Sequence, residues 1–145
     1  DIQSGANPPP LPGRLELRHL PSGKLAVFDT AHTPASVAHV LSTPLVRDLP
    51  RPLLVAGLLT AERQADVVFA PVAESGLPLY LLGQESTLPG SLSFLSEEKF
   101  YRALSHSGAL SFLFLGSHRL YPLFHAFTSW KKDEQSTDRK GPAEL

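Results

Sequence analysis

The sequence predicts an α/β domain in which a mostly parallel sheet lies between two layers of helices. The continuous apolar run 53–57 indicates a strand that is buried on both faces, and the largely apolar segments 78–82 and 111–115 indicate two more strands. Segments with apolar residues at helical spacing lie between these runs. Strands that alternate with helices favour parallel pairing through right-handed crossovers. With 145 residues, 42% of them hydrophobic, the chain is long enough for one domain with its own core.

A β-hairpin is expected at the start of the sheet. Residues 14–20 alternate apolar and polar side chains, which indicates a half-buried strand. Pro21-Ser22-Gly23-Lys24 is a turn sequence, and the run 25–28 is the next strand. Because the connection is so short, the two strands pair antiparallel. The full prediction is a Rossmann-like three-layer sandwich with an N-terminal antiparallel hairpin.

Four helices are expected between and after the parallel strands. The first runs from Thr33, which can cap it, to about Ser42, with Pro34 in its first position. A proline-punctuated connection, 43–52, follows it. The second helix starts at Thr60 and ends near Pro71. The third starts at Ser96, and the fourth is marked by an apolar stripe over 120–127.

The two ends of the chain differ in composition from its middle. Residues 1–12 are rich in proline and small side chains, which predicts an interdomain linker. Because this linker opens the chain and the sequence contains no methionine, we expect the chain to begin inside a longer polypeptide. Residues 131–145 are charged, without apolar periodicity, and predict a disordered tail. The domain itself is therefore expected at 13–130.

The composition argues against several classes of function. A net charge of −1 does not fit a nucleic-acid binder, which would carry a basic stripe. No apolar run is long enough to span a bilayer, so no membrane partner is expected. The absence of cysteine excludes disulfides, thiolate metal sites and a cysteine nucleophile. It fits a reducing compartment, and we expect a cytoplasmic protein.

Asp29 and His32 are the first candidate binding residues. Asp29 ends a strand, and His32 lies in the loop before the Thr33 cap. Ligands of open α/β sheets bind at the carboxyl edge of the strands, where the loops after residues 29, 57, 83 and 116 are expected to meet. The alternative is that Asp29 merely ends a strand and His32 is a solvated loop residue. The sequence pattern alone leaves both interpretations open.

Arg14 and Ser117 also have two interpretations each. Arg14 is either an exposed charge after a turn or a guanidinium directed at phosphate. Gly116-Ser117 is either a strand-to-helix turn or a hydroxyl at a helix N-terminus that faces an anion such as a carboxylate. The histidines do not have the spacing of a helical metal site with a nearby carboxylate, so no metal is expected within the chain.

The sequence contains neither a phosphate loop nor a G-x-G-x-x-G nor a G-x-S-x-G motif, and we expect no catalytic residue within it. Its motifs nevertheless resemble a known family. Gly13-Arg14-Leu15-Glu16 and Asp29-Thr30-Ala31-His32-Thr33-Pro34 are similar to the GR-[LFM]-E and D-x-A-H-[NT]-P segments of the C-terminal domain of the Mur ligase superfamily. The segments 55–60 with 69–73, and 115–121, resemble its branch of folylpolyglutamate and dihydrofolate synthases.

The resemblance implies an enzyme that joins glutamate to a folate carboxylate with MgATP through an acyl phosphate. Arg14 would reach the phosphates, Asp29 would hold the ribose hydroxyls, His32 would lie against the nucleoside, and Ser117 would belong to the glutamate side. The phosphate loop and the magnesium ligands would lie in an N-terminal ATPase domain of the same protein. The resemblance thus implies a monomeric ligase of folate metabolism. This segment alone would be inactive.

The sequence departs from the family pattern at three places. Thr30 and Thr33 replace a glycine and an asparagine, Ala61-Glu62-Arg63 replaces a D-K-D-like stretch, and His118-Arg119 is inserted before Leu120-Tyr121. Two alternatives to the folate ligase therefore stay open. One is a stand-alone, non-catalytic Rossmann-like binding domain, and the other is the C-terminal domain of a cell-wall Mur amide ligase.

Overall fold

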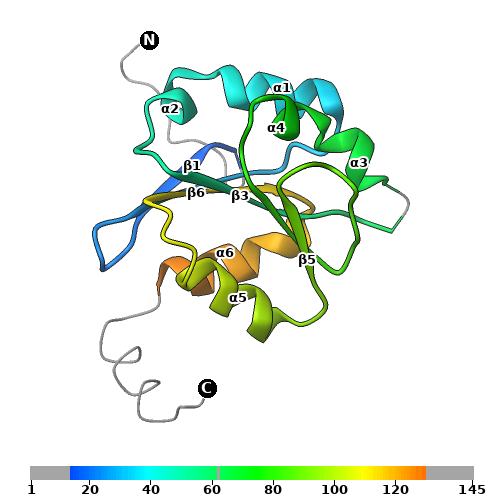
Figure 1. The fold of residues 1–145 in the computed structure, drawn as a ribbon. Helices are drawn as coiled ribbons and strands as arrows, with labels where there is room; N and C mark the ends of the chain where they lie inside the picture. The colour runs from blue at the N-terminus through cyan, green and yellow to red at the C-terminus, as the bar shows by residue number, and fades with distance from the viewer. Residues whose placement is uncertain (1–13, 62, 130–145) are drawn as a thin grey trace.

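The computed structural model describes residues 14–61 and 63–129, which form one six-stranded sheet between two layers of helices (Figure 1). The expected linker 1–12 and tail 131–145 lie outside the described residues. The strands and helices, in chain order, are β1 Glu16–His19, β2 Leu25–Asp29, α1 Pro34–Ser42, α2 Pro44–Arg47, β3 Leu53–Leu58, α3 Ala65–Val68, α4 Ala70–Glu74, β4 Leu79–Leu82, β5 Ser91–Phe94, α5 Glu97–Ser105, β6 Ser111–Gly116, the 3-10 turn η1 His118–Leu120 and α6 Tyr121–Thr128.

The sheet confirms the predicted fold class. The strand order is β1-β2-β6-β3-β4-β5, and β1 pairs antiparallel with β2 while all other neighbouring strands are parallel. The last strand in the chain, β6, lies between β2 and β3, so β6 and β3 are the two central strands. All six residues of each are buried, which agrees with their largely apolar sequences.

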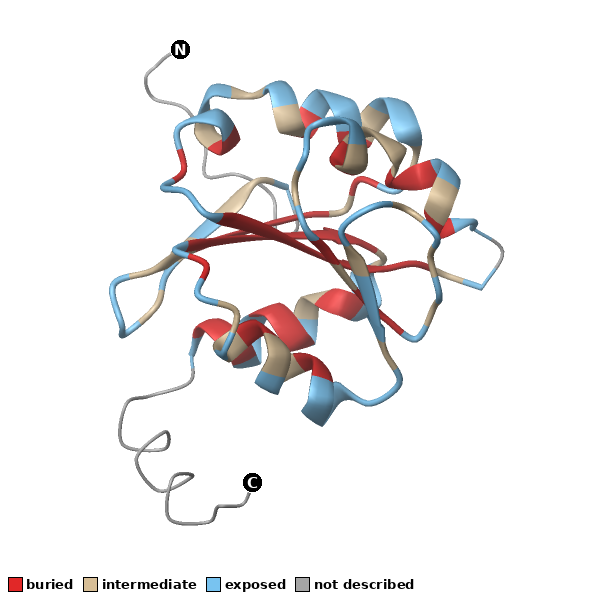
Figure 2. Cartoon of the chain, viewed as in Figure 1, coloured by how far each residue is buried: buried red, intermediate tan, exposed pale blue. Residues whose placement is uncertain are grey.

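Each face of the sheet has its own core (Figure 2). Helices α1 to α4 cover one face, called here the upper face, and α5 and α6 cover the other, called the lower face (Figure 1). The upper core is largely aliphatic, with Val27, Val55 and Leu113 from the strands. The lower core is largely aromatic, with Phe28 and Phe114 from the same strands. Adjacent residues of one strand thus serve different cores, because side chains alternate along a strand.

The expected helix from Thr60 to Pro71 is wrong in detail. Two short helices, α3 and α4, take its place and meet at Phe69. Gln64, and not Thr60, is the N-cap residue of α3, and its side chain makes no cap hydrogen bond. Pro71 lacks the N–H that would continue α3, but it fits the first turn of α4, where an amide has no helical partner. It starts a helix where we expected it to end one.

The sequence also missed two elements. The connection 43–52 contains α2, which Thr43 caps by accepting from the Val46 amide. The strand β5 pairs with β4 in parallel after the connection 83–90, which contains no helix. Asp66 of α3 accepts from the amide and the hydroxyl of Thr87, and hydrogen bonds from Ser86 and Thr87 lower its pKa. Leu88 packs on the upper core, so this connection covers part of that face in place of a helix.

Candidate functional site

The carboxyl edge of the parallel strands brings the predicted site segments side by side. In the sheet register Asp29 pairs with Leu115, and Leu115 pairs with Gly57 on its other side. The loop after β2 therefore starts next to the loop after β6, as expected for one shared edge. Arg14 lies at the same edge, because β1 runs antiparallel and its first residue, Glu16, pairs with Phe28.

Asp29 is a buried carboxylate, with 8% of its surface exposed. Its Oδ2 accepts from the Leu15 amide at 3.1 Å, and its Oδ1 accepts from the Ala31 amide at 2.8 Å. The first bond spans 14 residues of sequence and joins the start of β1 to the end of β2. Each carboxylate oxygen has two lone pairs, so one acceptor position on each remains beyond these bonds.

Arg14 is exposed and makes no hydrogen bond or ion pair with the residues that the structure describes. The next residue, Leu15, has a φ of 47°, and within 14–61 and 63–129 no other residue except glycine has a positive φ. A left-handed leucine costs about 1–2 kcal/mol and persists where the surroundings hold it. Here the side chain of Leu15 packs against the upper core while its amide binds Asp29.

His32 is exposed, and its Nδ1 lies 2.8 Å from the carbonyl oxygen of Thr30. Because a carbonyl only accepts, Nδ1 carries the proton of this bond, and Nε2 of the neutral ring is left as an acceptor. The next residue, Thr33, caps α1: its hydroxyl accepts from the Ser36 amide, and the Ser36 hydroxyl accepts from the Thr33 amide. Pro34 occupies the first turn. The expected helix start is confirmed.

Ser117 is a cap rather than a free hydroxyl. Its Oγ accepts from the Arg119 amide at 3.1 Å, and its own amide donates to the Leu58 carbonyl at 2.7 Å. Gly116 has a φ of 130°, and a Cβ at this position would collide with the Leu58 carbonyl oxygen. The strand-to-helix turn is therefore the role that the structure shows. The hydroxyl starts a turn of only three residues, η1, before α6 begins.

The sequence reasoning missed a polar cluster that ties β1 to α6. Arg18 donates to the Glu16 carboxylate at 2.7 Å and to the Tyr121 hydroxyl at 3.1 Å. The Tyr121 hydroxyl donates to Glu16, and this bond is the main cause of a raised Tyr121 pKa. The Nδ1 of His125 lies 3.0 Å from Arg18 and must accept, since a guanidinium only donates. The alternation in 14–20 predicts that Glu16 and Arg18 lie on one face of the strand, but it does not predict that Tyr121 contacts them.

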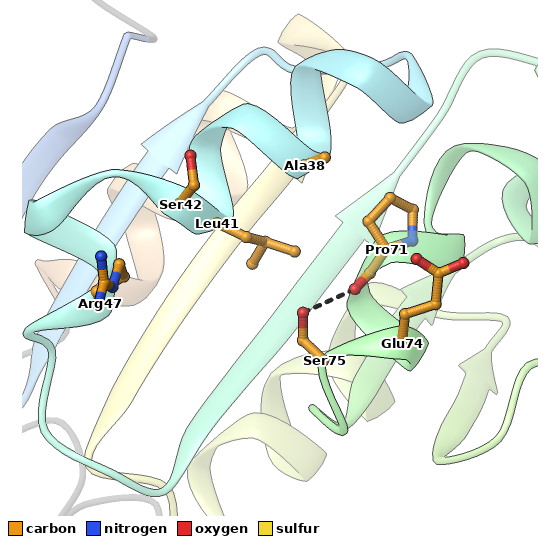
Figure 3. A pocket seen from close by; sticks show the side chains of 7 residues that line it. All are labelled: Ala38, Leu41, Ser42, Arg47, Pro71, Glu74 and Ser75. Atoms are coloured by element: carbon orange, nitrogen blue, oxygen red, sulfur yellow. Dashed lines mark hydrogen bonds between the residues drawn. The ribbon is translucent and has the colours of Figure 1, made fainter.

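A shallow depression lies elsewhere, between α1, α2 and α4 on the upper face (Figure 3). Leu41 and Pro71 form part of its lining, with Arg47 and Glu74 at its borders. The Ser75 hydroxyl, which also lines it, donates to the Pro71 carbonyl at 2.9 Å. None of Arg14, Asp29, His32 and Ser117 takes part. This depression is therefore separate from the predicted binding residues, of which Arg14 and His32 are exposed and Asp29 is buried.

Over 14–61 and 63–129, no group of three or more histidine, aspartate or glutamate side chains is placed to hold a metal ion. In the same ranges no helix is long and apolar enough to cross a membrane.

Comparison with known proteins adds a structural neighbour. No protein-family model and no curated protein matches the sequence. The fold is similar to that of a bifunctional folylpolyglutamate synthase/dihydrofolate synthase from Yersinia pestis, a crystal structure complexed with AMPPNP and a manganese ion. The TM-score is 0.58 at 16% identity, over 81% of this chain and 31% of that one. The chain thus spans about a third of that protein, and at this identity the likeness shows the fold.

Proposed function

We propose that this chain is the C-terminal, nucleotide-closing domain of an ATP-dependent ligase that joins glutamate to folates, as a folylpolyglutamate synthase does. One observation carries the proposal: the Asp29 carboxylate binds the Leu15 and Ala31 amides, and so joins the segment 14–16 to the segment 29–34 at the carboxyl edge. These are the segments that resemble the Mur ligase superfamily. The similar fold of the folylpolyglutamate synthase/dihydrofolate synthase also supports this proposal.

The residues at this edge suit a nucleotide. Arg14 is an exposed planar guanidinium, which fits a phosphate with two parallel hydrogen bonds. His32 presents Nε2 and its ring to the nucleoside, and Asp29 has acceptor positions left for ribose hydroxyls. ATP would supply the phosphoryl group that activates the folate carboxylate. Ser117 lies on the neighbouring loop, and we assign it to the glutamate side.

The remaining parts of the active site would come from an N-terminal ATPase domain of the same protein. The sequence has no phosphate loop, and the described residues offer no carboxylate cluster for Mg²⁺. The structural neighbour is about three times as long as the matched region, which leaves room for such a domain. The isolated chain is then inactive, and the cytoplasmic location and monomeric state remain predictions.

The nucleotide role can be tested on the 145-residue chain itself. Titration with MgATP, followed by ¹⁵N NMR, is expected to shift the amide signals of 30–33 and 116–119. Arg14→Ala should weaken this binding about tenfold or more, since a charged hydrogen bond contributes about 1.5–3 kcal/mol. Arg47→Ala removes an equally exposed arginine beside the upper-face depression and serves as the matched control. Equal affinities for both variants would refute the assignment of Arg14.

The acceptor is tested on the whole natural protein. Glutamate addition to pteroyl-type acceptors, with ADP release, supports the folate ligase. Activity only on muramyl acceptors would identify a cell-wall ligase. A protein that binds MgATP at this edge but turns over neither acceptor would be a binding domain without catalysis.

A further inference from the structure

We propose that Asp29 is a positioning residue, which fixes Arg14 and His32 relative to each other before any ligand binds. The inference rests on the proposed function insofar as Arg14 and His32 contact the nucleotide. It goes beyond that function because it gives Asp29 a role through protein groups, in addition to any contact with ribose.

The geometry that supports this role is a bridge between two chain segments. Asp29 uses a different oxygen for each: Oδ2 for the Leu15 amide and Oδ1 for the Ala31 amide. Arg14 is the residue before Leu15, and His32 is the residue after Ala31. One buried carboxylate therefore controls the backbone beside both exposed side chains.

Leu15 shows why the start of β1 needs this support. Its φ of 47° is unfavourable for leucine, and an extended φ would turn either its own side chain or Arg14 to a different side. The bond to Asp29 and the packing of Leu15 on the upper core act together to hold this conformation. With Leu15 directed into the core, the preceding Arg14 emerges into solvent at the carboxyl edge.

The other half of the bridge sets the loop after β2. The Ala31 amide turns back on the Asp29 side chain two residues earlier, which is an Asx-type turn. Within that turn the Thr30 carbonyl accepts from His32 Nδ1 and holds the imidazole ring. The cap at Thr33 then fixes the loop from its other end. His32 is consequently held by Asp29 through Thr30 and Ala31, and not by direct contact.

The first experiment examines the bridge without ligand. In the unmutated chain, the amide protons of Leu15 and Ala31 are expected to exchange slowly with solvent, because each donates to one oxygen of Asp29. In Asp29→Asn the side-chain nitrogen cannot accept a hydrogen bond, so at least one of the two amides should move upfield and exchange about tenfold faster. Asp48→Asn removes an exposed carboxylate at the end of α2 and is the matched control. If both amides keep their chemical shifts and exchange rates in Asp29→Asn, the proposal is overturned.

The second experiment is a double-mutant cycle on MgATP affinity with Arg14→Ala and Asp29→Asn. If Asp29 acts by positioning Arg14, the loss caused by Arg14→Ala should fall from about tenfold in the unmutated chain to about twofold in the Asp29→Asn background. If the full tenfold loss persists, Asp29 acts independently of Arg14 and the positioning role is refuted. If the unmutated chain binds no MgATP, the proposed function fails for this chain, while the amide measurements still decide whether the bridge exists.

Discussion

The two faces of the sheet are packed in different ways. The lower core contains six phenylalanines, and all three tyrosines of the chain pack against it. The upper core contains Phe69 as its single aromatic residue and is otherwise built from valine, leucine and alanine. The helices α5 and α6 cover the lower face, whereas α1, three helices of four or five residues and the connection 83–90 cover the upper face. The face with the larger side chains is thus the one covered by fewer elements.

The difference also bears on the candidate site. The Leu15 side chain packs on the upper core, and its amide binds Asp29. Ser117 leads into the lower layer, where the rings of Phe124 and Phe114, with centroids 5.3 Å apart, pack α6 against the sheet. The Asp29 side of the site thus adjoins a largely aliphatic core, and the Ser117 side adjoins an aromatic one.

The largest expected effect comes from Phe114→Ala on the lower face. Phe114 is fully buried and contacts both Phe124 and Phe127, so truncation should lower the free energy of unfolding by about 3–5 kcal/mol. Leu113→Ala is the matched change, because Leu113 is the adjacent residue, equally buried, and points into the upper core. Urea denaturation measures both. A larger loss for Leu113→Ala would contradict the view that rings dominate the lower face.

The upper face accommodates its one phenylalanine by means of a glycine. A Cβ on Gly57 would lie 2.7 Å from the Phe69 ring and 3.0 Å from Leu81. Gly57→Ala should therefore cost about 1–3 kcal/mol in unfolding free energy through overpacking. Phe69→Leu is expected to relieve the clash, so the double variant should be more stable than the sum of the single effects predicts. Strict additivity would show that the ring is not the obstacle.

The caps of the upper helices allow a finer test. Thr33→Ala removes the hydroxyl that accepts from Ser36 at the start of α1, and should cost about 1 kcal/mol of unfolding free energy. Gln64→Ala, at the start of α3, removes a side chain that makes no cap bond and should change stability by less than about 0.5 kcal/mol. Thermal denaturation distinguishes the two. Equal losses would mean that α1 is held by packing alone.

The comparison also explains what the sequence could predict. The runs 53–57 and 112–115 are apolar throughout because both cores need them, and such runs are recognisable without a structure. The strand β5 was missed because Ser91–Phe94 has only four residues, two of them serine, and lies at the sheet edge. The α3–α4 break was missed because proline fits a helix start as well as a helix end.

The position of the candidate site could be predicted from the sequence, but the hydrogen bonds between its residues could not. Asp29, His32 and Arg14 were found from motif order, and the strand register places them at one edge. The bond from Leu15 to Asp29 depends on the antiparallel register of β1 and on an unusual φ, neither of which a sequence pattern contains. The bond between Tyr121 and Glu16 joins residues 105 positions apart, and only the packing of α6 on the lower face creates it.

The smallest expected effect concerns Tyr101, which packs on the lower core and should make stability depend on pH. Burial, with a smaller contribution from Glu97, raises the Tyr101 pKa to about 12. The unfolded chain releases this proton near pH 10, so the folded state binds more protons between pH 10 and 12, and the unfolding free energy falls as pH rises through this range. Tyr101→Phe loses the hydrogen bond to the Leu123 carbonyl, which contributes about 0.5–1.5 kcal/mol.

At neutral pH this variant should therefore be slightly less stable than the unmutated chain, and the gap should close as pH rises from 10 to 12. Urea denaturation at a series of pH values measures the gap. Tyr80→Phe changes another tyrosine on the same face while leaving the Tyr101 hydroxyl in place, and should keep the alkaline decline. If the unfolding free energies of Tyr101→Phe and the unmutated chain follow parallel curves against pH, the hydroxyl of Tyr101, whose ring stacks on Phe127, does not cause the alkaline loss of stability.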